Sequence, residues 1–402
     1  MAAERGRRRA GPGGLRRKGR LTELLGAGVI DSFGMALGWT VLVLLAVNRG
    51  GLAEAALYNA AMLLGVVLAA PVTGWLSRRV PGRSLLRGTA AVEFVLRIGT
   101  LWGLIAGMPS WSVAVGVLVM HVAAWSGFAA MRAEVNAVDS SPRAMTRYAL
   151  CIAAVEAVGT GVAALLPSGA GGYPTGWPLI LVFAVYAGSV VPTMVSARRA
   201  RVTPQPAAGP RPRRRIAVSP KLLAAGGAVT LLSAGPTLLA VPITTELHGR
   251  TWVAGAAVAF SIGCLLSTVA VEVIGRVRVP AVLRWTLWGL GMLIGWIGVP
   301  SHAYHVLLAQ FLAGSSQTAF EGDMDALVAK DAPPDGVTTA LAYSASVRAL
   351  GGSISVRLLP LLVTAQAIDK VVSAAVLVLG ITALLIWGAA AMPRVTRTAG
   401  AA

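Results

Sequence analysis

The stretch RRARVTPQPAAGPRPRRRIAVSPK, residues 198–221, divides this chain in two. It is rich in proline and arginine and has no apolar period, so it predicts a linker. On both sides lie mostly apolar runs of about 20 residues, the length that a helix needs to cross a bilayer. Six such runs precede the stretch and six follow it: 22–48, 52–76, 84–107, 112–136, 145–167 and 177–196, then 220–245, 251–274, 281–299, 302–327, 337–364 and 369–391.

The composition agrees with a membrane protein and excludes most soluble folds. Hydrophobic residues make up 56% of the chain and charged residues 13%, against roughly 45–50% and 25% in soluble proteins. The net charge of +19 comes from short bursts of Lys and Arg between apolar runs, without the clustered basic face of a nucleic-acid binder. We therefore expect an all-α polytopic membrane protein of twelve transmembrane helices that contacts lipid and does not bind nucleic acid.

The basic residues also predict an orientation. If the N-terminus is inside, 29 of the 35 Lys and Arg residues fall in cytoplasmic segments, and only Arg49, Arg250 and Lys370 fall outside. Cytoplasmic loops of membrane proteins carry such an excess. We expect a multi-pass protein of the cell membrane with both termini cytoplasmic: a basic tail (1–21), a six-helix bundle (22–197), the linker (198–219), a second bundle (220–392) and a cytoplasmic tail (393–402).

Short fragments recur at equivalent places in the two halves. RVP occurs at 79–81 and at 278–280, and VEAVG at 155–159 corresponds to VRALG at 347–351. Internal symmetry of this kind is typical of transporters. The fragments predict that the halves are distant copies of each other.

With twelve spans, a long basic central loop and duplicated halves, the chain resembles the major facilitator superfamily of transporters. GWLSRRVPGR at 74–83 is similar to that family's G-x-L-A-D-R-x-G-R-R signature, since Gly74, Leu76, Arg79 and Arg83 fit, whereas Arg78 stands where the signature has Asp. The resemblance implies a gating loop here and puts its usual acidic latch in doubt. IDSFG at 30–34 resembles an opening common in actinobacterial members.

Ionisable residues inside spans are the candidates for chemistry, because each costs about 2.5–3.5 kcal/mol on insertion scales. Asp31 has Gly28 and Gly34 three residues to either side, hence on one helical face. The resemblance implies that this face lines the central cavity, where Asp31 would take up and release a proton. The alternative is a carboxylate held by an Arg or the backbone for packing.

Two further sets of charges lie within spans. Glu93 and Arg97 stand four residues apart on one helical face. They form either a self-neutralising pair or a proton site at Glu93 that Arg97 controls. Glu156 and Arg348 occupy matching places in the two halves with opposite charge. We keep Glu156 as a proton-coupling candidate and Arg348 as a substrate-cavity candidate, with pairing to neighbours as the alternative for both.

Other polar residues could line a substrate cavity. His121 and Trp125 lie one turn apart and share a face, although a histidine in a span is often a satisfied helix contact. The remaining candidates are Tyr58, Asn59, Gln310 and Gln317. The acidic residues Glu321, Asp323 and Asp325 do not predict a metal site, because their spacing places them on different helix faces. We expect them to meet basic loops such as the one that holds Arg78 and Arg79.

These features predict a secondary transporter that moves a small organic molecule by alternating access, most simply a proton-coupled exporter. Uptake on the same fold is the first alternative, and a membrane-embedded enzyme or a non-transporting sensor is the second. The chain has no G-x-x-x-x-G-K-[ST] and no H-E-x-x-H. We therefore expect no enzymatic activity, no cofactor and no metal, and a monomer whose partners are the substrate, protons and the lipid bilayer.

Overall fold

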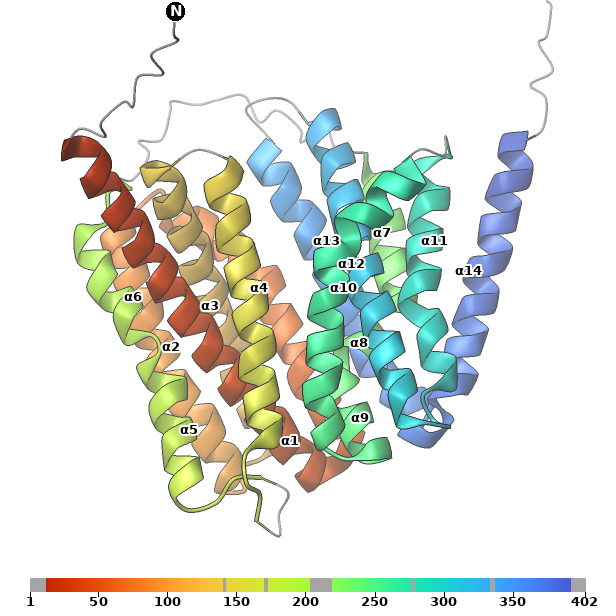
Figure 1. Cartoon of the computed structure of the whole chain (residues 1–402), viewed down its shortest axis with the longest axis horizontal. Helices are drawn as coiled ribbons and strands as arrows, with labels where there is room; N and C mark the ends of the chain where they lie inside the picture. The colour runs from red at the N-terminus through yellow and green to blue at the C-terminus, as the bar shows by residue number, and fades with distance from the viewer. Residues whose placement is uncertain are drawn as a thin grey trace, which may run out of the picture. The chain divides into compact units, whose positions relative to one another are not determined.

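The computed structural model describes residues 12–139, 142–169, 173–202, 219–275, 279–332 and 337–391. Within these ranges every regular element is a helix (Figure 1), as the sequence predicts. Most of the central linker and the ends of both tails lie outside the described residues. What the sequence indicates for those segments stays a prediction.

The helices of the first half match the first six predicted spans. The first two spans form one element, α1 (Pro12–Leu76), and the next three are α2 (Gly82–Ile105), α3 (Ser110–Val138) and α4 (Pro142–Leu165). The sixth span is broken into α5 (Trp177–Gly188) and α6 (Val191–Ser196), followed by a 3-10 turn, η1 (Ala197–Arg199). Pro192 follows this break directly. A proline has no amide hydrogen and clashes with the carbonyl four residues earlier, so a regular helix does not continue through it.

The two predicted spans within α1 are joined without a loop. Gly50 and Gly51 have non-helical backbone angles, and Gly51 has a φ of 62°. Glycine adopts positive φ at little cost because it has no Cβ. A reversal of only two residues therefore separates the predicted spans 22–48 and 52–76.

The second half gives six further segments. The seventh span is divided into α7 (Pro220–Ser233), α8 (Gly235–Leu238) and α9 (Ala240–His248), with Pro236 and Pro242 near the breaks. The others are α10 (Thr251–Gly275), α11 (Ala281–Leu293) with the 3-10 turn η2 (Ile294–Gly298), α12 (Ala303–Asp331), α13 (Val337–Leu362), and α14 (Ile368–Ala391) after η3 (Ala365–Ala367).

Length and composition allow many of these helices to cross a membrane. Seven segments among the described residues are long and apolar enough, and the first of them, Gly19–Leu76, holds two predicted spans. The shorter apolar helices Leu150–Leu165, Pro220–Ser233 and Thr251–Ser267 come in addition. Apolar helices in this number support a multi-pass membrane protein.

The chain forms two compact units, each with its own core. One comprises Met1–Arg215 with Gly249–Val258, and the other Ile216–His248 with Ala259–Ala402. In the first unit, α1 to α4 bury an apolar cluster around Leu24, Leu86, Met131, Val135 and Tyr148. In the second, α7, α11 and α12 pack around Trp285 and Phe320, whose rings meet edge to face at 5.9 Å.

Two glycines of α1 allow the sixth span to approach it closely. A Cβ at Gly34 would overlap the side chain of Ser189, and one at Gly38 would overlap the ring of Tyr186. Ser189 and Tyr186 are both buried. Small residues at such positions are how helices come close together in membranes.

We predict that Gly38→Ala lowers the stability of the protein, because its methyl group would overlap the Tyr186 ring. Overpacking of this kind costs about 1–3 kcal/mol. Gly26→Ala in the same helix is the matched control, since its Cβ meets nothing within 4 Å and alanine favours a helix by about 1 kcal/mol over glycine. The melting temperatures of the purified variants in detergent measure the difference. Equal melting temperatures would contradict the close approach.

Candidate functional site

A cavity of about 330 Å³ lies within the first unit. Side chains of α1, α2, α3, α4 and α6 form its wall. The volume falls in the range of small-molecule sites. All four proton-coupling candidates line it, together with a histidine and four aromatic residues: Asp31, Glu93, Arg97, Glu156, His121, Trp39, Trp125, Phe128 and Tyr148.

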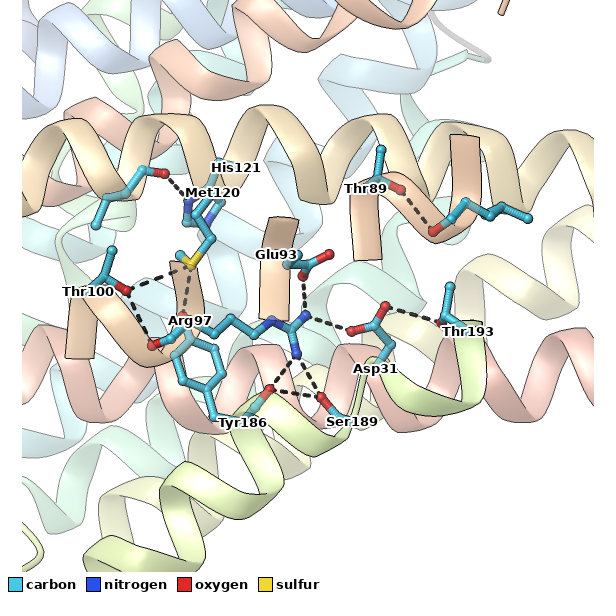
Figure 2. Close-up of polar contacts among 12 residues, drawn as sticks. Asp31, Thr89, Glu93, Arg97, Thr100, Met120, His121, Tyr186, Ser189 and Thr193 are labelled. Carbon is cyan, nitrogen blue, oxygen red and sulfur yellow. Dashed lines mark hydrogen bonds and ion pairs between the residues drawn. The ribbon is translucent and has the colours of Figure 1, made fainter. Parts of the chain in front are cut away.

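Arg97 on α2 is the centre of the polar contacts in this cavity (Figure 2). Its Nη2 lies 2.6 Å from Oδ1 of Asp31 on α1 and also forms an ion pair with Glu93, one turn away on α2. The Arg97 side chain is 1% exposed. The pair predicted from the spacing of Glu93 and Arg97 is therefore present, and Asp31 joins it.

The other terminal nitrogen of Arg97 is held by the break between α5 and α6. Nη1 donates to the carbonyl oxygen of Tyr186 and to Oγ of Ser189, both at 2.7 Å. In an unbroken helix the amide of Val190 would donate to the Tyr186 carbonyl, but here it donates to Ala187. The break thus frees a backbone acceptor, and Arg97 uses it.

Asp31 is the more accessible of the two carboxylates that share Arg97. Its side chain is 24% exposed, against 5% for Glu93, and its Oδ2 accepts a bond of 3.4 Å from Thr193. Gly28 lines the cavity with Asp31, as predicted, whereas Gly34 faces Ser189. When all three groups are ionised, one guanidinium neutralises one of two carboxylates, and one negative charge remains.

Glu156 on α4 lines the same cavity away from this group. Within the described residues its exposed carboxylate makes no hydrogen bond or ion pair. Its counterpart in the second half, Arg348, differs in this respect. Arg348 pairs with Asp325 at 2.7 Å and donates to Ser344. The opposite charges at matching places therefore have different surroundings.

His121 and Trp125 both line the cavity from α3, as their spacing predicts. His121 is buried, its Nδ1 lies 2.9 Å from the carbonyl of Val117, and its ring meets Trp39 edge to face at 4.9 Å. These contacts favour a structural histidine. Trp125 is 44% exposed and leaves its ring accessible.

Tyr58 and Asn59 are not among the residues that line this cavity. Tyr58 donates to Glu54, and Asn59 donates to the carbonyl of Ala55 one turn earlier. Glu54 also pairs with Arg49 at 2.8 Å and accepts a bond from Ser110. Tyr58 belongs to a polar cluster close to the Gly50–Gly51 reversal.

The second unit holds the remaining candidates. Gln317 donates to Glu321 at 3.1 Å, and Gln310 is buried with no partner for its Nε2 among the described residues. The expectation that the acidic residues of α12 meet basic loops is wrong for two of the three, because their partners are arginines on helices. Asp323 binds Arg284 through two hydrogen bonds of 2.6 and 2.9 Å, and Asp325 binds Arg348. A nearby basic residue of the same unit satisfies each carboxylate.

The predicted gating loop is a short exposed turn between α1 and α2. Arg78, Arg79 and Arg83 are exposed, and a Cβ at Gly74 would meet nothing within 4 Å. The Arg79 guanidinium lies 4.2 Å from the ring centroid of Trp75. Arg78 forms no ion pair within the described residues, so the arginine in place of the signature Asp makes no acidic latch there.

Glu134 at the end of α3 makes a contact that sequence reasoning did not identify. Its fully buried carboxylate accepts hydrogen bonds of 2.7–3.0 Å from the backbone amides of Arg201 and Val202, where the linker begins. The Val202 carbonyl in turn accepts a bond of 2.9 Å from the amide of Gly82. Glu134 therefore ties the first linker residues to the gating loop. A lone glutamate at a helix end carries no signal of such a role.

We predict that Arg97→Gln destabilises the protein by about 3–5 kcal/mol, because it leaves the buried Glu93 and the partly buried Asp31 without their cation. The triple variant Asp31→Asn, Glu93→Gln, Arg97→Gln removes all three charges and is expected to recover most of that loss. Thermal unfolding in detergent measures both. If the triple variant is no more stable than the single one, the charges do not act as one group.

We also predict that Glu134→Gln speeds tryptic cleavage after Arg201, because an amide cannot accept all of the backbone bonds that the carboxylate accepts. Mass spectrometry of timed digests gives the rate at this bond. Glu54→Gln, an equivalent change at the Tyr58 cluster, is the control and should leave the rate unchanged. Equal rates in all three proteins would show that Glu134 does not hold the linker.

No family model and no curated protein matches the sequence. Solved structures do match its fold. The nucleoside transporter NupG is 11% identical with a TM-score of 0.68, and the match covers 92% of this chain and 100% of that chain. A D-xylose–proton symporter is 12% identical with a TM-score of 0.68, over 91% and 97% of the two chains.

A bacterial homologue of the iron transporter ferroportin, in its inward-facing state, is 17% identical with a TM-score of 0.64, over 94% and 99% of the two chains. These three proteins are named for different cargoes, so the shared architecture does not specify a substrate. Identities this low establish the fold alone. The chain has the fold of the major facilitator superfamily transporters, as its sequence predicts.

Proposed function

We propose that this protein is a secondary transporter that moves a small organic molecule across the cell membrane by alternating access, coupled to protons and in the direction of export. The observation that carries the proposal is a cavity with four ionisable side chains inside a membrane-spanning bundle. Intramembrane charges mark substrate and proton pathways, because their cost must be offset by a function. The transporter fold supports the same conclusion.

Proton coupling is supported by the imbalance of charge around Arg97. Asp31 and Glu93 compete for one guanidinium, so the group carries one excess negative charge. A proton on either carboxylate would cancel that excess and leave Arg97 paired with the other one. Asp31 is the better entry point, because more of its side chain is accessible. No step in this exchange leaves the buried cation without a partner.

The direction of transport has one competing alternative. A structural neighbour is titled a D-xylose–proton symporter, so this fold also supports proton-coupled movement of a substrate in the same direction as the proton. Uptake by the same cavity is therefore the second candidate function. The resemblance of residues 30–34 to actinobacterial sequences supports the same family and does not separate the two directions.

A deletion strain and its complemented parent separate export from uptake. We expect the deletion strain to retain more of one or more metabolites or added toxic compounds than the complemented strain, measured by mass spectrometry of washed cells. A compound that is depleted in the deletion strain would establish uptake instead. Identical profiles across a broad panel that includes charged and aromatic compounds would count against transport.

We predict that Asp31→Asn abolishes gradient-driven accumulation of the compound found in that comparison, while exchange without a gradient persists. Asparagine can still accept the bond from Arg97 but cannot exchange a proton at this position. Proteoliposomes with and without an imposed proton gradient measure both activities. Asp369→Asn, outside the cavity, is the control. Equal gradient dependence in the parent and in Asp31→Asn would show that coupling does not pass through Asp31.

A further inference from the structure

The unpaired carboxylate of Glu156 is the part of the cavity that the Arg97 group does not explain. Among the lining residues Arg97 is the one permanent cation, and Asp31, Glu93, Tyr186 and Ser189 already occupy its two terminal nitrogens. Glu156 is exposed into the cavity and, within the described part of the chain, has no polar partner. A carboxylate in a membrane span without a counter-ion calls for a cation from elsewhere.

Aromatic rings form the wall of the cavity on α3 and α4. The rings of Trp125 and Phe128 meet edge to face with centroids 5.6 Å apart, and the ring of Tyr148 lies 5.8 Å beyond Phe128. The face of an aromatic ring attracts a cation through its quadrupole. Phe128 already has the guanidinium of Arg132, which does not line the cavity, 5.7 Å from its ring centre.

Three of the hydroxyl groups that line the cavity already form hydrogen bonds within the protein. Thr89 donates to the carbonyl of Leu85, Thr193 donates to Asp31, and Thr160 accepts from Thr40. The hydroxyls of Ser32 and Tyr148 remain, and the excess of carboxylates repels an anion. The cavity is also lined by three methionines, Met35, Met62 and Met131. Their flexible, polarizable side chains can adapt to apolar groups of varied shape.

We propose that the cavity binds a monovalent organic cation with an apolar or aromatic body. The positive charge pairs with Glu156, and the body lies against the wall of Trp125, Phe128 and Tyr148. When a proton neutralises the excess charge of the Arg97 group, Glu156 is the one carboxylate left without a cation, and it matches one positive charge. The proposal rests on the proposed function, because it names the substrate class of the same cavity.

Direct binding to the purified protein tests the proposal without a transport assay. The probe is tritiated tetraphenylphosphonium, a permanent cation that cannot exchange a proton, and its uncharged relative triphenylphosphine oxide is the competitor. We expect saturable binding of the cation that excess unlabelled cation displaces and the neutral compound does not. Binding displaced equally by both compounds would show that the site selects shape and not charge, and would overturn the proposal.

Variants assign the binding to Glu156 and the aromatic wall. Glu156→Gln keeps the shape and removes the charge, and we expect a dissociation constant about tenfold higher or more. Trp125→Leu keeps an apolar surface and is expected to weaken binding about fivefold. Glu23→Gln, whose carboxylate pairs with Arg20 and Arg199, is the control and should bind as the parent does. Melting temperatures verify that each variant is folded.

The outcomes separate this inference from the proposed function. If a folded Glu156→Gln variant binds the cation as tightly as the parent, the proposed cation site is wrong. This holds even if the protein transports another compound in vesicles. If cation binding depends on Glu156 but vesicles move no compound, the site stands and the transport proposal fails.

Discussion

The buried guanidinium of Arg97 joins the helices around the cavity of the first unit. Arg97 is almost fully enclosed, and an arginine in that position is stable only where acceptors surround it. Those acceptors come from α1, α2 and the α5–α6 break, so the contacts that satisfy the charge also fix three helical segments around the cavity. Moving any one of them would remove an acceptor from one of the two terminal nitrogens of Arg97.

The two units balance their charges differently. In the second unit, Arg284 with Asp323 and Arg348 with Asp325 form one-to-one pairs. In the cavity of the first unit, three carboxylates accompany one arginine. Pairs that cancel contribute mainly to cohesion, whereas an excess of one sign can bind something that carries the other. The uncompensated charge around the described cavity therefore belongs to the first unit, although both units come from similar runs of sequence.

The sequence predicts the architecture well because the bilayer imposes a simple constraint on the length and polarity of each helix. An apolar run long enough to cross a bilayer becomes a helix, and the proline-rich and glycine-rich breaks lie where the structure ends or bends its helices. The pair of Glu93 and Arg97 also follows from local spacing. Local spacing does not predict the contact of Asp31 with Arg97 or the three backbone bonds of Glu134. The partners are 66 or more residues apart, so these contacts depend on how the helices pack. Periodicity carries no information about such contacts.

The break between α5 and α6 has a consequence for how this sequence can change. Restoring a regular helix at Ser189–Val190 would ordinarily be neutral or favourable, but here it would return the Tyr186 carbonyl to the helix and deprive Arg97 of an acceptor. The effect of changing the irregular backbone therefore depends on whether Arg97 is present, and the effect of changing Arg97 depends on the backbone. Among relatives of this chain, we expect the two to be kept or lost together.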